Sequence, residues 1–304
     1  MSGLPESGHF TGHDGTRLFF RVWAGAPEEP SRALVLHHGL GEHSGRYGNV
    51  VEALRDERVN IYTYDARGHG RSDGIRGDAR GISDFVRDLE CFLLFLRREA
   101  GIRQPILLGH SLGGLVVLAF GVSYSNQWEV RAIATSGAGL RPHLNAEQKV
   151  KKAVGQLLFR VKPQLVLPSG LPPSFLSHDQ GVIKAYQNDH LCHDRISVRM
   201  ALSLLSAGEE TLRKASLLKI PVLITHGTDD QITDASASRE FYDNCLSDDR
   251  ELILYPGLYH EIYNETEKER SRVLMDLRRW LRNQLPVVKP AAASVNSATE
   301  HATT

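Results

Sequence analysis

The stretch ILLGHSLGGLVVLAF (residues 106–120) decides the fold class, because two different patterns meet in it at one serine. Residues 106–110 form the short apolar run of a buried strand, and an apolar helical segment begins at residue 112. Ser111 stands between them, with a glycine two positions away on either side. A G-x-S-x-G motif between strand and helix is typical of a nucleophile elbow, a tight turn that exposes the serine hydroxyl. The context favours this interpretation over an ordinary Gly-Ser bend.

Strand-like and helical segments alternate over most of the chain. Short β-rich runs that end in turn residues lie at 17–23, 32–39, 59–74, 130–139, 220–230 and 250–260. Helical spacing covers 47–57, 83–101 and 267–285. In the segment 83–101, Ser83 is a candidate N-cap and Gly101 a candidate stop. This alternation predicts an α/β fold with a mostly parallel central sheet and helices on both faces.

Residues 141–210 interrupt the alternation, because they contain no convincing strand. Helical spacing covers 147–162, and two more helical segments follow at 179–189 and 196–215. We expect a helical cap over 141–210, inserted into a core formed by residues 1–140 and 211–285. The Pro/Ala/Ser/Thr-rich stretch 286–304 predicts a disordered tail.

Composition narrows the class of protein. The 304 residues contain 36 basic and 36 acidic side chains, so nothing in the charge suggests a nucleic-acid partner. Three scattered cysteines argue against a disulfide framework and fit a reducing compartment. Neither a signal peptide nor an apolar run of membrane-spanning length is evident, so we expect a cytoplasmic protein.

A serine nucleophile requires a base and an acid that orients the base. His260 follows the last strand-like run, and two acids, Asp229 and Asp230, follow the run before it. Both positions are expected at the edge of the sheet where Ser111 lies, in the order nucleophile, acid, histidine. Adjacent residues point in different directions, so only one acid should reach the histidine, and the pattern leaves the choice open.

An attacked carbonyl also needs two N–H donors for the developing oxyanion. The Leu112 amide, at the start of the helix behind Ser111, is the first candidate. The loop HHGLGEHSGRY (37–47), which turns on two glycines after an early strand, provides the second, and we expect the Leu40 amide to fill this role.

Five blocks together, HHGLGEHSGRY, YDARGHGRSDG, GHSLGG, HGTDDQIT and YPGLYHEIYNE, resemble the monoacylglycerol lipase and lysophospholipase branch of the α/β-hydrolases, a serine aminopeptidase S33-type family. The resemblance covers about residues 8–285 and implies an α/β-hydrolase fold. The family's G-x-x-D block ends at Asp230, which favours this residue over Asp229. The resemblance also implies that the YDARGHGRSDG segment is structural, with Asp65, Arg67 and Arg71 bracing a loop.

Three further residues are substrate-binding candidates by this resemblance. Glu42 and Arg46 match family positions that line a polar pocket for the glycerol end of the substrate; the alternative for the pair is a salt bridge that braces the loop. Tyr263 stands where the mammalian members have a second histidine, which puts strict glycerol preference in doubt.

The expected function is hydrolysis of monoacylglycerol or lysophospholipid-like esters, with Ser111, Asp230 and His260 as the catalytic residues and with no metal or organic cofactor. The alternatives are a general short-chain carboxylesterase, a serine aminopeptidase of the same fold, and a non-enzymatic scaffold. Basic residues beside the apolar face of the cap make peripheral membrane contact a further hypothesis, against simple packing on the core.

Overall fold

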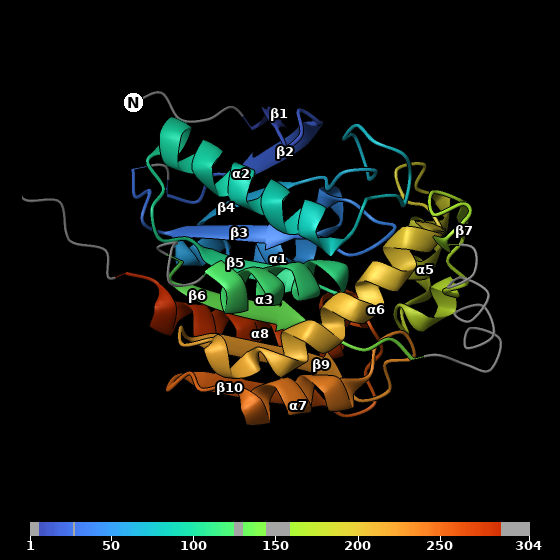
Figure 1. Ribbon diagram of the computed structural model, residues 1–304. Coiled ribbons are helices and arrows are strands. Elements are labelled where there is room, and N and C mark those ends of the chain that lie inside the picture. Colours follow the sequence, from blue (N-terminus) through green and yellow to red (C-terminus); the bar gives the residue numbers. More distant parts are fainter. Residues whose placement is uncertain (1–5, 27, 125–129, 144–158, 287–304) are drawn as a thin grey trace, which may run out of the picture.

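An eight-stranded sheet runs through the part of the chain that the computed structural model describes, residues 6–26, 28–124, 130–143 and 159–286 (Figure 1). Its strands, in spatial order, are β1 (Ser7–Thr11), β2 (Arg17–Trp23), β4 (Asn60–Tyr64), β3 (Ala33–His37), β5 (Ile106–His110), β6 (Ala132–Ser136), β9 (Val222–Gly227) and β10 (Arg250–Tyr255). The pairings from β4 to β10 are parallel, whereas β1 and β2 pair in antiparallel fashion at one edge. The predicted mostly parallel sheet is confirmed.

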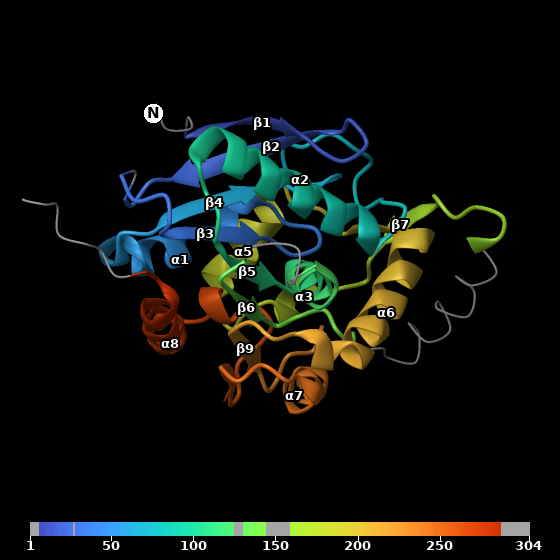
Figure 2. The same cartoon turned by 60° about the vertical axis from the view of Figure 1, so that its left-hand side comes forward.

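Helices cover both faces of this sheet, as expected for parallel strands that are apolar on both sides. One face packs against α1 (Gly48–Ala53) and α8 (Glu267–Gln284), and the other against α2 (Ile82–Ala100), α3 (Leu112–Tyr124) and α7 (Ala235–Asn244). Figure 2 shows the two groups on opposite sides of the sheet. Helix α3, directly after Ser111, is the most deeply buried, since Leu115, Val116 and Val117 have no exposed surface.

Helix α2 matches the expected segment, with one correction at its start. The helix begins at Ile82 after an extended Gly81, so Ser83 lies inside the first turn and is not the N-cap. Gly101 ends the helix in the left-handed conformation, as the sequence predicts. Strand β1 is not among the strands that the sequence predicts, because only one of its five residues is buried and its sequence carries little apolar signal.

The described part of the predicted cap lies beyond the carboxyl ends of the parallel strands, the side toward which the arrows of β3 and β6 point in Figure 1. It contains α5 (Gln180–Asn188) and most of α6 (Val198–Arg213). The expectation that residues 141–210 hold no strand is wrong, since β7 (Val166–Pro168) and β8 (Arg195–Ser197) form a short antiparallel pair. Three-residue strands are too short to produce a periodic pattern.

The division into core and cap stays a prediction, and helix α6 packs on both sides of the predicted boundary. Most of α6 falls within 141–210, yet its Met200 is fully buried in the same apolar cluster as α2 and α3. The expected helix over 147–162 lies mainly outside the described residues, as does the tail after residue 286. Within the described ranges, no helix combines the length and the apolar character needed to span a membrane.

Candidate active site

Ser111 lies on a sharp turn between β5 and α3. Its φ of 53° is left-handed, one of two such values among the described non-glycine residues. The strained turn is held on both sides, because the Ser111 N–H donates to the Ser136 carbonyl (2.9 Å) and the Ser111 carbonyl accepts from Gly139 N–H (2.9 Å). A side chain at Gly113 would collide with the His37 carbonyl, since its Cβ would lie 2.1 Å from that oxygen. The backbone therefore has the strand–turn–helix geometry of a nucleophile elbow.

His260 and Asp230 meet at the carboxyl ends of β10 and β9. The His260 Nδ1 lies 2.7 Å from the Asp230 Oδ2, and both side chains are buried. The His260 ring packs against the ring of His110, the residue before Ser111, at 4.8 Å between centroids. Because Nδ1 faces a carboxylate, it carries the proton, and Nε2 is left as the acceptor. This is the tautomer that a general base requires.

The structure separates the two candidate acids. Asp229 is exposed, and its Oδ1 accepts from its neighbour Thr228 Oγ1 (2.9 Å). Asp230 turns inward, where Oδ1 accepts from the backbone N–H groups of Ile232 (2.7 Å) and Thr233 (3.0 Å). The geometry thus brings Asp230, and not Asp229, to His260.

Two residues that contact Asp230 are not among the site residues predicted from the sequence. Thr233 donates its hydroxyl to Oδ2 (2.7 Å), and His226 Nε2 lies 3.0 Å from the same oxygen. His226 also contacts the Ser238 hydroxyl through Nδ1 (2.7 Å). The signal for both was present as close spacing within the segment 226–233, but spacing alone does not show that the turn folds back on its own carboxylate.

The electrostatics fit an ionised acid beside a basic histidine. Burial opposes the charge on Asp230, but His260 and the hydrogen bonds from its partners hold the pKa of this carboxyl well below its usual range. Burial likewise opposes protonation of His260, yet the Asp230 carboxylate raises the pKa of His260 above its ordinary value of 6.5. His110 behaves in the opposite way, since burial lowers its pKa to about 4 and keeps its ring neutral.

The two predicted oxyanion donors belong to segments that lie next to Ser111. Leu112 is the first residue of α3, so its amide belongs to the N-terminal turn of a helix, where N–H groups favour negative charge. Leu40 follows Gly39, which lies so close to Ser111 that a Cβ at position 39 would be 3.1 Å from the Ser111 Cβ. The loop after β3 therefore passes directly over the serine, as an oxyanion loop requires.

The three predicted substrate-binding residues lie in two different places. Glu42 and Arg46 form a largely buried ion pair within the loop 37–47, with Arg46 Nη1 2.9 Å from Glu42 Oε2. Tyr263 is buried in the apolar cluster between the sheet and α8. A residue that the sequence analysis did not single out, Glu261, holds Arg46 through two hydrogen bonds (2.6 and 2.8 Å).

Comparisons with known proteins agree with this geometry. A family model described as serine aminopeptidase S33 matches residues 28–267. A monoacylglycerol lipase of Mycolicibacterium smegmatis is 33% identical over 94% of this chain and 100% of its own length, and a phospholipase of Bacillus subtilis is 29% identical over 82% and 95%. The crystal structure of a Paleococcus ferrophilus monoacylglycerol lipase has a TM-score of 0.79 and 30% identity, over 88% of this chain and 99% of that one. The chain belongs to the serine aminopeptidase S33 family and has the α/β-hydrolase fold.

Proposed function

We propose that this protein is a serine hydrolase that cleaves the ester bond of monoacylglycerols through an acyl-enzyme intermediate. The observation that carries the proposal is the pairing of buried His260 with Asp230 beside a serine in a left-handed elbow. The substrate class rests on the similar proteins named monoacylglycerol lipase, of which the bacterial relative matches along its full length.

The proposed chemistry gives each of the three side chains one role. Ser111 Oγ attacks the ester carbonyl carbon while His260 Nε2 takes the hydroxyl proton, and Asp230 stabilises the imidazolium that forms. The Leu40 and Leu112 amides donate to the carbonyl oxygen as it becomes negative. His260 then returns the proton to the departing glycerol oxygen. In the second half, His260 deprotonates a water molecule that attacks the acyl-enzyme; the fatty acid leaves, and His260 returns the proton to Ser111 Oγ.

The rival activities have less support. An aminopeptidase needs an unpaired acid to hold the substrate's α-amino group, and the predicted cap contains two acids in sequence, Glu209 and Glu210. Glu209 lies 3.3 Å from Arg141 Nε, and Glu210 lies 2.6 Å from Lys214 Nζ, so both already have a cationic partner. Lysophospholipid is the second candidate substrate, because one relative is named a phospholipase.

The cap is also where we place peripheral membrane contact. The stretch 159–167 of the predicted cap has four exposed apolar side chains, Phe159, Val161, Leu165 and Leu167, with the exposed cations Arg160 and Lys162 between them. Exposed apolar groups interleaved with cations favour the surface of an anionic bilayer. Co-sedimentation with anionic vesicles, lost in a Phe159→Ser/Val161→Ser variant, is the expected result. Equal sedimentation of both proteins would contradict this contact.

A substrate panel tests the proposed activity. The panel consists of monoacylglycerols of several chain lengths, lysophosphatidylcholine, p-nitrophenyl butyrate and aminoacyl p-nitroanilides, each with the wild type and with Ser111→Ala as the blank. We expect the highest kcat/KM on a monoacylglycerol. A higher kcat/KM on the anilides would reassign the protein as an aminopeptidase, and a higher value on the lysophospholipid would reassign the substrate.

A further inference from the structure

A buried network of three charged side chains links two loops of the active site that are far apart in sequence. Glu42 follows the oxyanion loop, Arg46 lies in the short helix Ser44–Arg46, and Glu261 directly follows His260. Arg46 Nη1 donates to Glu42 Oε2 (2.9 Å) and to Glu261 Oε1 (2.6 Å), while Nη2 donates to Glu261 Oε2 (2.8 Å). One guanidinium therefore joins a carboxylate from each loop.

This set of side chains, the Arg46 network, is almost inaccessible to solvent. The side chains of Glu42 and Glu261 are 4% exposed, and that of Arg46 is 10% exposed. Although burial raises the pKa of Glu42, Arg46, the neighbouring histidines and the Tyr47 hydrogen bond together outweigh this effect and lower the pKa to about 2. Burial also disfavours charge on Arg46, but Glu261 and Glu42 raise its pKa above the usual value. Glu42 and Arg46 are thus ionised together, and charge-assisted hydrogen bonds in a dry environment hold geometry tightly.

The two carboxylates of the Arg46 network, Glu42 and Glu261, are each fixed to backbone next to a candidate site residue. Glu42 Oε1 accepts from the Gly39 N–H (2.6 Å) and from the Tyr47 hydroxyl (2.7 Å). Gly39 lies against Ser111 and precedes Leu40. At the other carboxylate, Glu261 follows His260 directly in the sequence. The Glu261 N–H donates a hydrogen bond to the Leu176 carbonyl (2.7 Å).

The same contacts argue against a direct role in binding glycerol. Both oxygens of each carboxylate already accept hydrogen bonds from Arg46, Gly39 or Tyr47. The flat face of the Arg46 guanidinium is covered by the Tyr186 ring, 4.9 Å from the ring centroid. A substrate hydroxyl would therefore meet oxygens that are each already hydrogen-bonded and almost inaccessible, which argues against them as the main contacts of the glycerol group.

We infer that Arg46 and Glu261 are positioning residues: through Glu42 they hold the oxyanion loop in register with the loop that carries His260. This inference rests on the proposed hydrolase activity and assigns the three groups to the rate of the chemical step instead of to recognition of the headgroup. When a substitution disrupts this side-chain network, Glu42 no longer holds the Gly39 N–H in place. The Leu40 amide is then no longer held where the oxyanion forms.

The test compares Glu42→Gln, Glu261→Gln and the double variant on two esters, a monoacylglycerol and p-nitrophenyl butyrate, which has no glycerol group. We expect each single variant to lower kcat by about 10- to 100-fold on both esters, below the loss for removing an oxyanion donor itself, with KM nearly unchanged. Because the residues act as one unit, the double variant should lose about as much as the worse single variant. Arg46→Lys, which keeps the charge without the paired geometry, should show the same pattern.

Two results would overturn the inference. An effect confined to the monoacylglycerol, expressed as a higher KM, would assign Glu42 and Glu261 to glycerol binding. A lower melting temperature with unchanged kcat per titrated active site would assign them to stability alone. If Glu261→Gln does not fold, Arg46→Lys decides between these outcomes in the same way. A wild type active only on p-nitrophenyl butyrate would contradict the proposed substrate and leave this test intact, whereas inactivity on both esters would contradict the hydrolase activity and this inference with it.

Discussion

Two buried arginines make similar contacts in this molecule and have different consequences. Arg46 lies between Glu42 and Glu261 beside the active site, and Arg67 lies between Asp14 and Asp88 on another part of the core. Arg67 donates Nε to Asp88 Oδ2 (2.7 Å) and Nη1 to Asp14 Oδ2 (2.9 Å). Both guanidinium groups are nearly inaccessible; Arg46 pairs with two carboxylates, and Arg67 also lies 3.8 Å from a third, that of Asp84.

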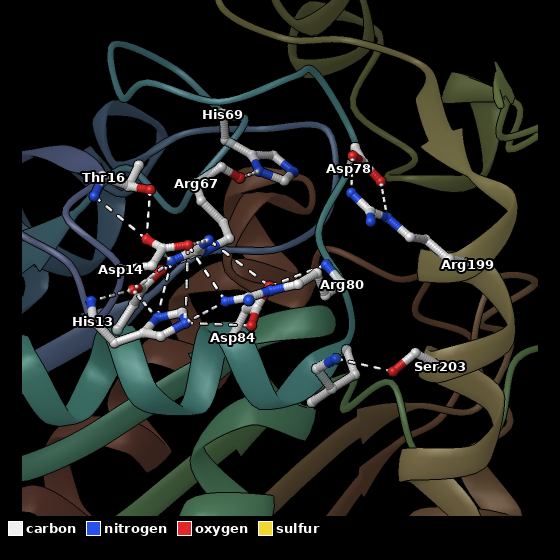
Figure 3. Close-up of polar contacts among 12 residues, drawn as sticks. His13, Asp14, Thr16, Arg67, His69, Asp78, Arg80, Asp84, Arg199 and Ser203 are labelled. Atoms are coloured by element: carbon white, nitrogen blue, oxygen red, sulfur yellow. Dashed lines mark hydrogen bonds and ion pairs between the residues drawn. The ribbon is translucent and has the colours of Figure 1, made fainter. Parts of the chain in front are cut away.

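The Arg67 network joins the β1–β2 turn to the start of α2. Figure 3 shows Arg67 directed toward Asp14 and His13 of the turn, above the helix that carries Asp84. His13 contacts two carboxylates of this helix, Asp88 through Nδ1 (2.9 Å) and Asp84 through Nε2 (3.3 Å).

The difference between the networks lies in the backbone that each one ties together. The Arg46 network connects the loops of Leu40 and His260, so a small shift changes the distance between reacting groups. The Arg67 network connects elements that carry none of the residues assigned to the reaction. The same chemistry should therefore control turnover in one place and stability in the other.

The largest expected effect is on the acid beside the Arg46 network. Asp230→Asn should lower kcat by about 10⁴-fold, because an amide no longer fixes the His260 tautomer or stabilises the imidazolium. Steady-state kinetics on p-nitrophenyl butyrate measures this loss. Asp229→Asn is the matched control, since Asp229 is exposed and should leave kcat nearly unchanged. A comparable loss of kcat in both variants would contradict the assignment of Asp230, and not Asp229, as the acid that orients His260.

The second effect is on stability and concerns the other network. Arg67→Met should lower the free energy of unfolding by about 3–5 kcal/mol, because Asp88 and Asp14 would lose their cation and Asp88 is fully buried. Chemical denaturation measures the change, and kcat per folded molecule should stay close to that of the wild type. Arg17→Met is the control: the Arg17–Asp73 pair is exposed and 3.7 Å apart, so its loss should matter little. A large loss of kcat in Arg67→Met would erase the distinction between the networks.

The third effect is a shift in the pH dependence of kcat/KM. In the proposed reaction His260 must be neutral to accept the proton from Ser111, and the pKa of His260 is raised above 6.5 by the Asp230 carboxylate. Activity should therefore fall as the pH drops through a value above 6.5. The residual activity of Asp230→Asn should persist to lower pH, since the group that raises the pKa of His260 is gone. The profile of Arg67→Met should coincide with that of the wild type, and a shift there would show that the two networks are coupled.

Much of this organisation could be predicted from the sequence, where local patterns determine it. The elbow at Ser111 could be recognised because a strand and a helix flank it, and His260 because it follows the acids and the last strand. The choice between Asp229 and Asp230 depends on how one turn folds, which no periodicity records. Glu261 could not be found, since its partner Arg46 lies 215 positions away in sequence. The substrate-binding interpretation of Glu42 came from resemblance, and the contacts favour a positioning role for it.

The central claim is that Ser111 is the nucleophile, and covalent labelling tests it most directly. A fluorophosphonate probe should add one adduct per molecule to the wild type, detected by intact mass and located on the peptide that contains Ser111. Ser111→Ala, with the same fold by circular dichroism, should remain unlabelled. An equal adduct on Ser111→Ala, or an adduct on another residue of the wild type, would contradict the account.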